Sequence, residues 1–179
     1  MKSKIAYEKD LCVKQYYETI SLLVITNFQK NMNGDAAAKA RKLFSGNNNC
    51  SQSVMKAILS EKNMDFDQVI PLMAGFGAGV AHEGNVCGAV SGAIAALGVL
   101  NSRQFGDVSE HKEATYASAE EFIRRFKKTH GSIICNNLTT IEMSDTKARN
   151  KAMKDGIFKR VCPSFVESAV RIALDVSEK

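Results

Sequence analysis

The sequence predicts an all-α fold, a single-domain helical bundle with a glycine-rich loop leading into a buried central helix. Alternating apolar and polar residues, which indicate a half-buried strand, are almost absent, whereas apolar residues recur at helical spacing. Only two prolines, Pro71 and Pro163, interrupt the 179 residues. The run 87–100 is apolar or small almost throughout and carries no charge, which is typical of a helix buried on all sides.

Residues 1–33 are predicted to form an N-terminal helical extension, separate from a four-cysteine domain over residues 34–179. The extension has apolar residues at positions that allow an amphipathic helix: Leu11, Tyr16, Ile20, Leu23 and Val24. The turn signal Asn31-Met32-Asn33-Gly34 marks its end. Cys12 lies in this extension and is predicted to pack there as a small apolar residue.

The four-cysteine domain is predicted to begin with two capped helices. Asp35 is the candidate N-cap of a helix that ends near Phe44. Asn47-Asn48-Asn49 supplies the cap of a helix over residues 50–62. Its apolar face consists of Val54, Ile58 and Leu59. A short helix over residues 69–73 and the glycine run 75–84 come next.

After the buried helix over residues 87–100, residues 101–108 are predicted to be a loop. A long charged amphipathic helix follows from Ser109 or Glu110 to Thr129. A polar helix is predicted over residues 145–154. The last helix is predicted to start at Cys162-Pro163, because proline is favoured in the first helical turn.

Composition excludes several classes of function. The formal net charge of +5 comes from lysines and arginines interleaved with acids, which predicts solvated helix faces and no nucleic-acid binding. The apolar run 20–25 is too short to span a bilayer, so no membrane span is expected. We also expect no signal peptide and a cytoplasmic location. The amphipathic extension raises the prospect of a homodimer.

Four cysteines are candidate site residues: Cys50, Cys87, Cys135 and Cys162. Three of them, Cys50, Cys87 and Cys162, are predicted to lie at helix N-termini. The unpaired N–H groups and the dipole of such an end stabilise a thiolate or an anionic cluster. Cys87 is therefore the expected low-pKa thiol and the candidate catalytic residue.

The residues leave several uses of these cysteines open. Four thiolates could hold a [2Fe–2S]-type iron–sulfur cluster for electron transfer with an unidentified redox partner protein. Alternatively, Cys87 could act in thiol–disulfide exchange, or the four thiols could form a non-catalytic zinc site. Inert buried cysteines are the fourth reading. No Cys-x-x-Cys pair occurs, so neither a zinc ribbon nor a thioredoxin site has its usual signature.

The glycine run is predicted to wrap around sulfur and donate backbone N–H groups to it. Glycines allow close backbone approach and positive φ, and the candidate cofactor-binding positions are Gly75, Gly77, Gly79 and Gly88. A dinucleotide-binding loop is disfavoured, because the preceding segment is helical and the third glycine falls one residue early. His82 lies in the run, five residues before Cys87, and is a further candidate ligand or proton donor.

These residues resemble a known family, C_GCAxxG_C_C, whose members are described as redox-active. The resemblance covers about residues 35–176. Its motifs are Asn49-Cys50, Gly75-Phe76-Gly77-Ala78-Gly79, Cys87-Gly88-Ala89-Val90-Ser91-Gly92, Cys135-Asn136 and Cys162-Pro163. It implies a mostly helical fold with Cys50, Cys87, Cys135 and Cys162 as the functional cysteines. A related domain accompanies haem-containing electron-transfer proteins and is associated with an iron–sulfur cluster, so the resemblance favours that cofactor.

Overall fold

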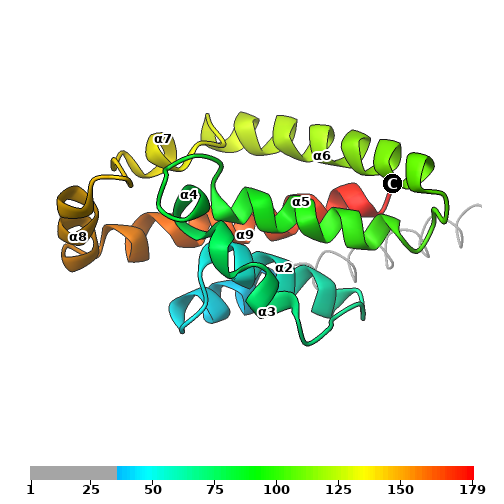
Figure 1. Cartoon of the computed structure of the whole chain (residues 1–179), viewed down its shortest axis with the longest axis horizontal. Helices are drawn as coiled ribbons and strands as arrows, with labels where there is room; N and C mark the ends of the chain where they lie inside the picture. Colours follow the sequence, from blue (N-terminus) through cyan, green and yellow to red (C-terminus); the bar gives the residue numbers. More distant parts are fainter. Residues whose placement is uncertain (1–35) are drawn as a thin grey trace, which may run out of the picture. The chain divides into compact units, whose positions relative to one another are not determined.

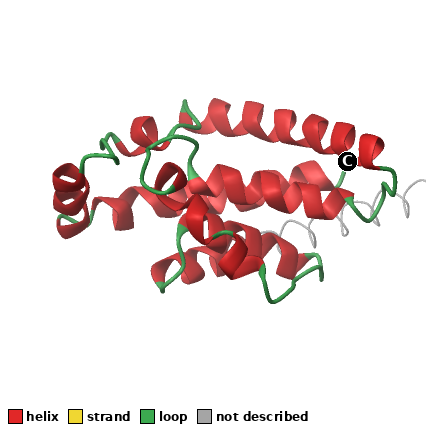
Figure 2. Ribbon diagram, viewed as in Figure 1, coloured by secondary structure: helices red, strands yellow, loops and turns green. Residues whose placement is uncertain are grey.

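A computed structural model describes residues 36–179. The predicted extension over residues 1–33 lies outside the described residues. Within 36–179 the chain is built from helices and loops, and a single β-bridge between Val86 and Ile134 is its only β pairing (Figures 1 and 2). The all-α prediction is confirmed. None of the described helices is both long enough and apolar enough to cross a membrane.

Residues 36–45 are helical and are followed by the labelled elements. These are α2 (Cys50–Glu61), α3 (Val69–Leu72), the 3-10 turn η1 (Ala74–Phe76), α4 (Gly77–Val80), α5 (Gly88–Asn101), α6 (Val108–His130), α7 (Cys135–Thr139), α8 (Thr146–Lys154) and α9 (Ile157–Ser177).

Helix α5 is the centre of the bundle and packs against α2, α6 and α9 (Figure 1). Small residues make the approach of α2 close. A Cβ atom built on Gly92 would lie 2.5 Å from the backbone oxygen of Ser51, so the two helices touch backbone to backbone there. Residues 54–59 of α2 and 89–100 of α5 supply much of the buried core. The predicted buried central helix is thus present.

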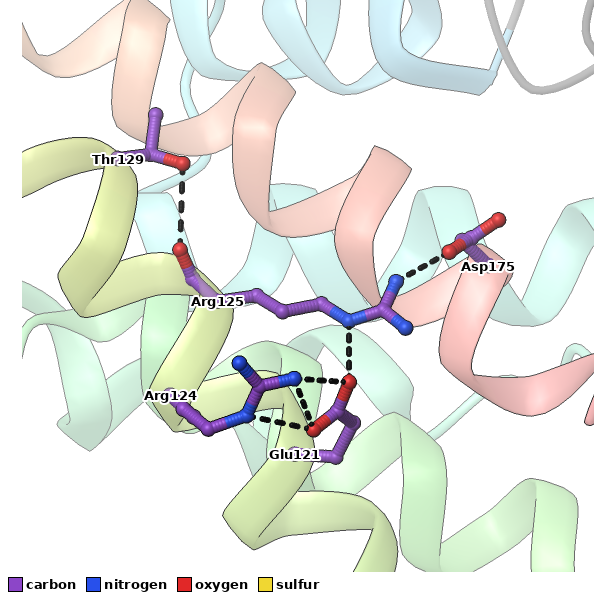
Figure 3. A network of polar contacts seen from close by, with 5 residues as sticks. All are labelled: Glu121, Arg124, Arg125, Thr129 and Asp175. Atoms are coloured by element: carbon purple, nitrogen blue, oxygen red, sulfur yellow. Dashed lines mark hydrogen bonds and ion pairs between the residues drawn. The ribbon is translucent and has the colours of Figure 1, made fainter.

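Helices α6 and α9 pack against each other, with the rings of His130 and Phe165 in contact, and are also joined by a polar network. Phe122 and Phe126 of α6 are fully buried, with ring centroids 5.8 Å apart. At the surface, Arg125 bridges Glu121 of its own helix and Asp175 of α9 (Figure 3). Hydrogen bonds from Arg124 and then Arg125 hold the pKa of the Glu121 carboxyl below its ordinary value.

Polar caps set the starts of three helices. The side chain of Asn49 accepts a hydrogen bond from the N–H of Gln52, whose side chain accepts one from the Asn49 N–H, forming a capping box for α2. Asp107 caps α6 and Asp145 caps α8, each with one side chain that accepts hydrogen bonds from two backbone N–H groups. These caps place the helix starts within a residue or two of the sequence prediction.

The predicted start of the last helix is wrong. Helix α9 begins at Ile157, so Pro163 lies inside it and Cys162 is not at a helix N-terminus. Proline lacks the N–H that would bond one turn back, which costs helix stability. The apolar positions Phe158, Cys162 and Phe165 share one face at helical spacing and all line the same cavity. This packing on both sides of the proline favours one continuous helix.

Candidate functional site

The four candidate cysteines line one cavity of about 160 Å³. They are free thiols and come from four different helices. Cys50 is the first residue of α2, Cys87 is the N-cap of α5, Cys135 is the first residue of α7, and Cys162 lies in α9. Segments separated by more than a hundred residues along the chain thus bring their sulfurs to one place.

The rest of the cavity wall is mostly apolar, with the aromatic rings of Phe44, Phe158 and Phe165 and the thioethers of Met143 and Met153. Asn49, Ala78, His82, Ala89, Thr139 and Arg149 complete it. One buried water needs roughly 10–15 Å³ of such space, so the cavity is large enough for a group of several atoms.

Backbone N–H groups converge on the sulfur of Cys50. The N–H groups of Ala78, Ser51 and Cys50 itself hydrogen-bond to it, and the Cys87 thiol adds a fourth bond. The Cys87 bond is the largest influence, and together these bonds outweigh burial and lower the pKa of Cys50 to about 7. Ala78 belongs to the glycine run, so one backbone N–H of that run reaches a sulfur, that of Cys50.

In the metal-free site the lowered thiol pKa falls on Cys50, and the catalytic role expected of Cys87 stays a prediction. The pKa of Cys87 is raised well above its ordinary value, first because its thiol hydrogen-bonds to Cys50, then because it is buried and lies near the Cys50 charge. A helix N-terminus stabilises either thiolate, but two adjacent thiols cannot both lose their protons cheaply. Backbone N–H groups of Ala78 and Ser51 also favour the charged form of Cys50.

Cys135 and Cys162 are protonated at neutral pH. Burial raises the pKa of Cys135 to about 11 and that of Cys162 to about 12, and the Cys50 thiolate adds to both shifts. In the metal-free site Cys50 is therefore the cysteine that ionises near neutral pH, while the other three thiols keep their protons.

The glycine run owes its shape to a left-handed turn. Five consecutive residues, 78–82, have positive φ, and four of them are not glycine: Ala78, Val80, Ala81 and His82. L-residues disfavour this region by roughly 1–2 kcal/mol each. Hydrogen bonds from the Ala81 N–H to the Gly75 oxygen and from the Asn85 N–H to the Gly79 oxygen, both 2.9 Å, close the turn. This turn presents the Ala78 N–H to Cys50.

Three of the four glycines predicted to bind a cofactor allow close approach. A Cβ atom on Gly88 would lie 2.5 Å from the Cys50 sulfur, and one on Gly77 would lie 2.7 Å from the Asn49 side chain. Gly79 has φ +71° and would place a Cβ atom 2.6 Å from the backbone of Asn85. Around Gly75 a Cβ atom would meet no atom within 4 Å, so no close approach requires glycine there.

No group of three His, Cys, Asp or Glu side chains among residues 36–179 is arranged to hold one metal ion. Four sulfurs on a single zinc lie about 3.8 Å apart, given a Zn–S bond of about 2.3 Å. Four thiols around one cavity are a donor set that both a zinc ion and an iron–sulfur cluster accept.

Sequence reasoning found the cysteines and His82 but missed Arg149 and Met153, which line the cavity from α8. The two residues are four apart, so they share a helix face. That spacing was a usable signal, but only the fold shows that this face turns toward the cysteines.

The fold and the cavity define an all-α protein with four cysteines gathered at one site. The chain belongs to the family described as "Putative redox-active protein (C_GCAxxG_C_C)", whose model matches residues 48–176. An "Uncharacterized protein" of Archaeoglobus fulgidus is 27% identical over 127 residues, which cover 66% of this chain and 84% of that protein. No solved structure matches the chain.

Proposed function

We propose that the four-cysteine cavity is a redox site and that Cys50, Cys87, Cys135 and Cys162 hold an iron–sulfur cluster of the [2Fe–2S] type. The observation that carries the proposal is the lining of one apolar cavity by four thiols from four helices. Membership of a family described as redox-active supports it. When bound, such a cluster would supply one-electron transfer.

The surrounding residues have the properties that an anionic centre requires. The backbone N–H groups of Cys50, Ser51 and Ala78 already stabilise negative charge on one sulfur. The rings of Phe44, Phe158 and Phe165 limit access of water. No Asp or Glu is among the residues that line the cavity in the described part of the chain, so none of them repels an anionic group.

The test is iron and acid-labile sulfide content, with a visible spectrum, on protein purified without oxygen and again after reconstitution. We expect iron with matching sulfide and charge-transfer bands, both lost in Cys50→Ser, Cys87→Ser, Cys135→Ser and Cys162→Ser. Cys12→Ser is the matched control and should keep both. Zinc without sulfide would mean that the site binds zinc and would overturn the cluster proposal. A protein that stays colourless after reconstitution would also overturn it.

A second candidate, thiol–disulfide exchange, is favoured by the hydrogen bond between Cys87 and Cys50. Here the Cys50 thiolate attacks a disulfide of a partner protein, forming a mixed disulfide and releasing one partner thiolate. Cys87 then loses its proton and attacks the Cys50 sulfur, forming the Cys50–Cys87 disulfide and releasing the second partner thiol. The partner disulfide is the oxidant and gains the two electrons.

This candidate makes Cys50 the nucleophile and Cys87 the resolving cysteine. With a model disulfide as substrate, Cys87→Ser should trap a mixed disulfide on Cys50, whereas Cys50→Ser should trap none. Trapping on Cys87 in the Cys50→Ser variant would reverse the roles. Absence of any adduct in both variants would reject the exchange chemistry. Either chemistry is proposed to operate in the cytoplasm, where free thiols persist.

A further inference from the structure

The positive charge of the described chain is concentrated in one segment. Residues 146–160, which contain α8 and the first turn of α9, hold six basic side chains and one acidic side chain, a net charge of +5. The other residues of 36–179 hold 13 basic and 14 acidic side chains, so together they are close to neutral. A surface patch of one sign attracts an oppositely charged partner, over a distance that the salt concentration sets.

The lysines of α8 form a stripe on its outer face. Lys147, Lys151 and Lys154 are spaced by four and three residues, so they share one side of the helix, and all three are exposed. Ala152, the one buried residue of α8, lies on another side. Lys151 pairs with Asp155 of the same segment. Lys147 and Lys154 form no ion pair with another residue of 36–179, so this lysine stripe has charge left for a partner.

The helix that carries the lysine stripe also forms an edge of the four-cysteine cavity. Cys87 and Cys135 are only 5% and 6% exposed. Among the described residues that line the cavity, His82 and Met153 are the exposed ones. Met153 belongs to α8, at one end of the bundle (Figure 1), and is 63% exposed. A partner that covers α8 therefore lies over an edge of the cavity.

The extent and direction of the lysine stripe favour a protein as the partner. Lys147 and Lys154 are seven residues apart, which is about 10 Å along a helix. Because the stripe is on the outer face of α8, a small anion inside the cavity does not contact it. Met153 adds an exposed apolar side chain, and methionine is enriched in protein interfaces. Helix α8 is described in full and has no other exposed large apolar residue, so it lacks the apolar face that binds a lipid surface.

We propose that α8 is the docking surface for an acidic redox partner protein, whose carboxylates pair with Lys147, Lys151 and Lys154. The proposal rests on the proposed function, because it takes the cavity to be a redox site, and it holds for a cluster and for a dithiol alike. Docking on α8 brings the redox group of the partner to the Met153 edge of the cavity. Opposite charges speed the encounter, and salt weakens this effect.

The test uses a plant-type [2Fe–2S] ferredoxin, an acidic electron carrier, as the probe for the full-length protein. Calorimetry measures its dissociation constant at about 10 mM and about 150 mM salt, and we expect at least about tenfold weaker binding at the higher salt. The stripe variant is Lys147→Gln/Lys151→Gln/Lys154→Gln. It should weaken binding about tenfold at the lower salt, the size expected for the loss of three exposed ion pairs.

The matched control is Lys39→Gln/Lys112→Gln/Lys179→Gln, which removes the same charge from exposed lysines outside the segment 146–160. It should bind ferredoxin as the wild type does. Equal binding by the stripe variant and the control would overturn the docking surface, and so would tighter binding of cytochrome c, a basic carrier, than of ferredoxin. Oligothymidylate that binds more tightly than ferredoxin, and is lost in the stripe variant, would overturn it in favour of a nucleic-acid site.

A crosslink map separates this proposal from the proposed function. Carbodiimide joins lysine amines to carboxylates in contact with them, and mass spectrometry locates the joined residues. We expect crosslinks from ferredoxin to Lys147, Lys151 or Lys154 whether or not the cavity holds a cluster. Such crosslinks in a protein without cluster or disulfide exchange would uphold the surface while the redox function fails. Crosslinks to other lysines in a cluster-containing protein would overturn the surface while the redox function stands.

Discussion

At the scale of single residues, the chemistry of the site depends on one sulfur. The Cys87 thiol and backbone N–H groups donate hydrogen bonds to the Cys50 sulfur, whereas Cys87 keeps its own proton. The sequence predicts that both cysteines lie at helix N-termini. It does not reveal which becomes the thiolate, because that depends on Ala78, a residue brought in by a turn that forms only in the folded chain.

The first prediction concerns the pH dependence of Cys50. In metal-free protein, its alkylation rate by iodoacetamide should rise with pH around a midpoint near 7, since its pKa is about 7 and the thiolate is the nucleophile. The rate should be low below this pH, where the thiol is protonated. Mass spectrometry of the labelled peptides measures it. A midpoint near the ordinary thiol value, or faster labelling of Cys87, would contradict the assignment.

The second prediction uses two glycines of the same helix. Gly88→Ala puts a Cβ atom 2.5 Å from the Cys50 sulfur and 2.8 Å from the Phe76 oxygen, so α5 must shift. We expect a loss of about 1–3 kcal/mol in the free energy of unfolding, together with a changed pKa of Cys50. Chemical denaturation and thiol titration measure the two effects.

Gly98→Ala is the control, because its Cβ atom would meet Thr115 at 3.6 Å, an ordinary contact. Alanine is favoured over glycine inside a helix, so this variant should gain roughly 0.5–1 kcal/mol. If both variants behaved alike, the tight contact between Gly88 and Cys50 would be wrong.

At the scale of elements, sequence patterns located most helices well because their caps and apolar faces are local. Asn49, Asp107 and Asp145 each cap a helix near the position that the sequence predicts. Two helix positions could not be predicted from local sequence patterns. The five-residue helix α7 is too short to show a period, and the start of α9 was displaced because packing of Phe158 outweighs the proline signal.

The third prediction compares two neighbours on α6. Phe126 is fully buried, so Phe126→Ala should cost about 3–5 kcal/mol of unfolding free energy. Arg125→Gln removes the ion pairs with Glu121 and Asp175, which lie at the surface, and should cost less than about 1 kcal/mol. Denaturant unfolding of both variants decides. A larger cost for Arg125→Gln would mean that the network in Figure 3 holds α6 to α9 more than the core does.

At the scale of the whole molecule, the sequence did not determine how the helices pair. It suggested that four cysteines had a shared purpose, but residue spacing carries no information on distances between helices. Convergence follows from α5, which contacts α2, α6 and α9 and so brings their ends, with α7, to one end of the bundle (Figure 1). The close approach at Gly92 that allows this is visible in sequence only as a small residue.

The fourth prediction concerns the division of the chain into two units. Residues 35–179 form one of them and are compact. A chain of residues 35–179 should fold alone, since the core residues of the described bundle lie within it. Its helical circular dichroism and cooperative unfolding should match a domain of that length, and the thiol pKa of Cys50 should stay near 7. Loss of cooperative unfolding would show that residues 1–34 complete the core.

The turn over Cys50 has a consequence for chirality. Residues 78–82 follow the mirror image of an ordinary right-handed helical turn, although they are built from L-amino acids. D-alanine favours positive φ, the backbone region that Ala78 and Ala81 occupy. Chemical synthesis could place D-alanine at both positions. The enantiomeric residues would fit the same backbone with the same amide on the sulfur. The natural chain, made on the ribosome, holds this mirror-handed turn only through the contacts around it.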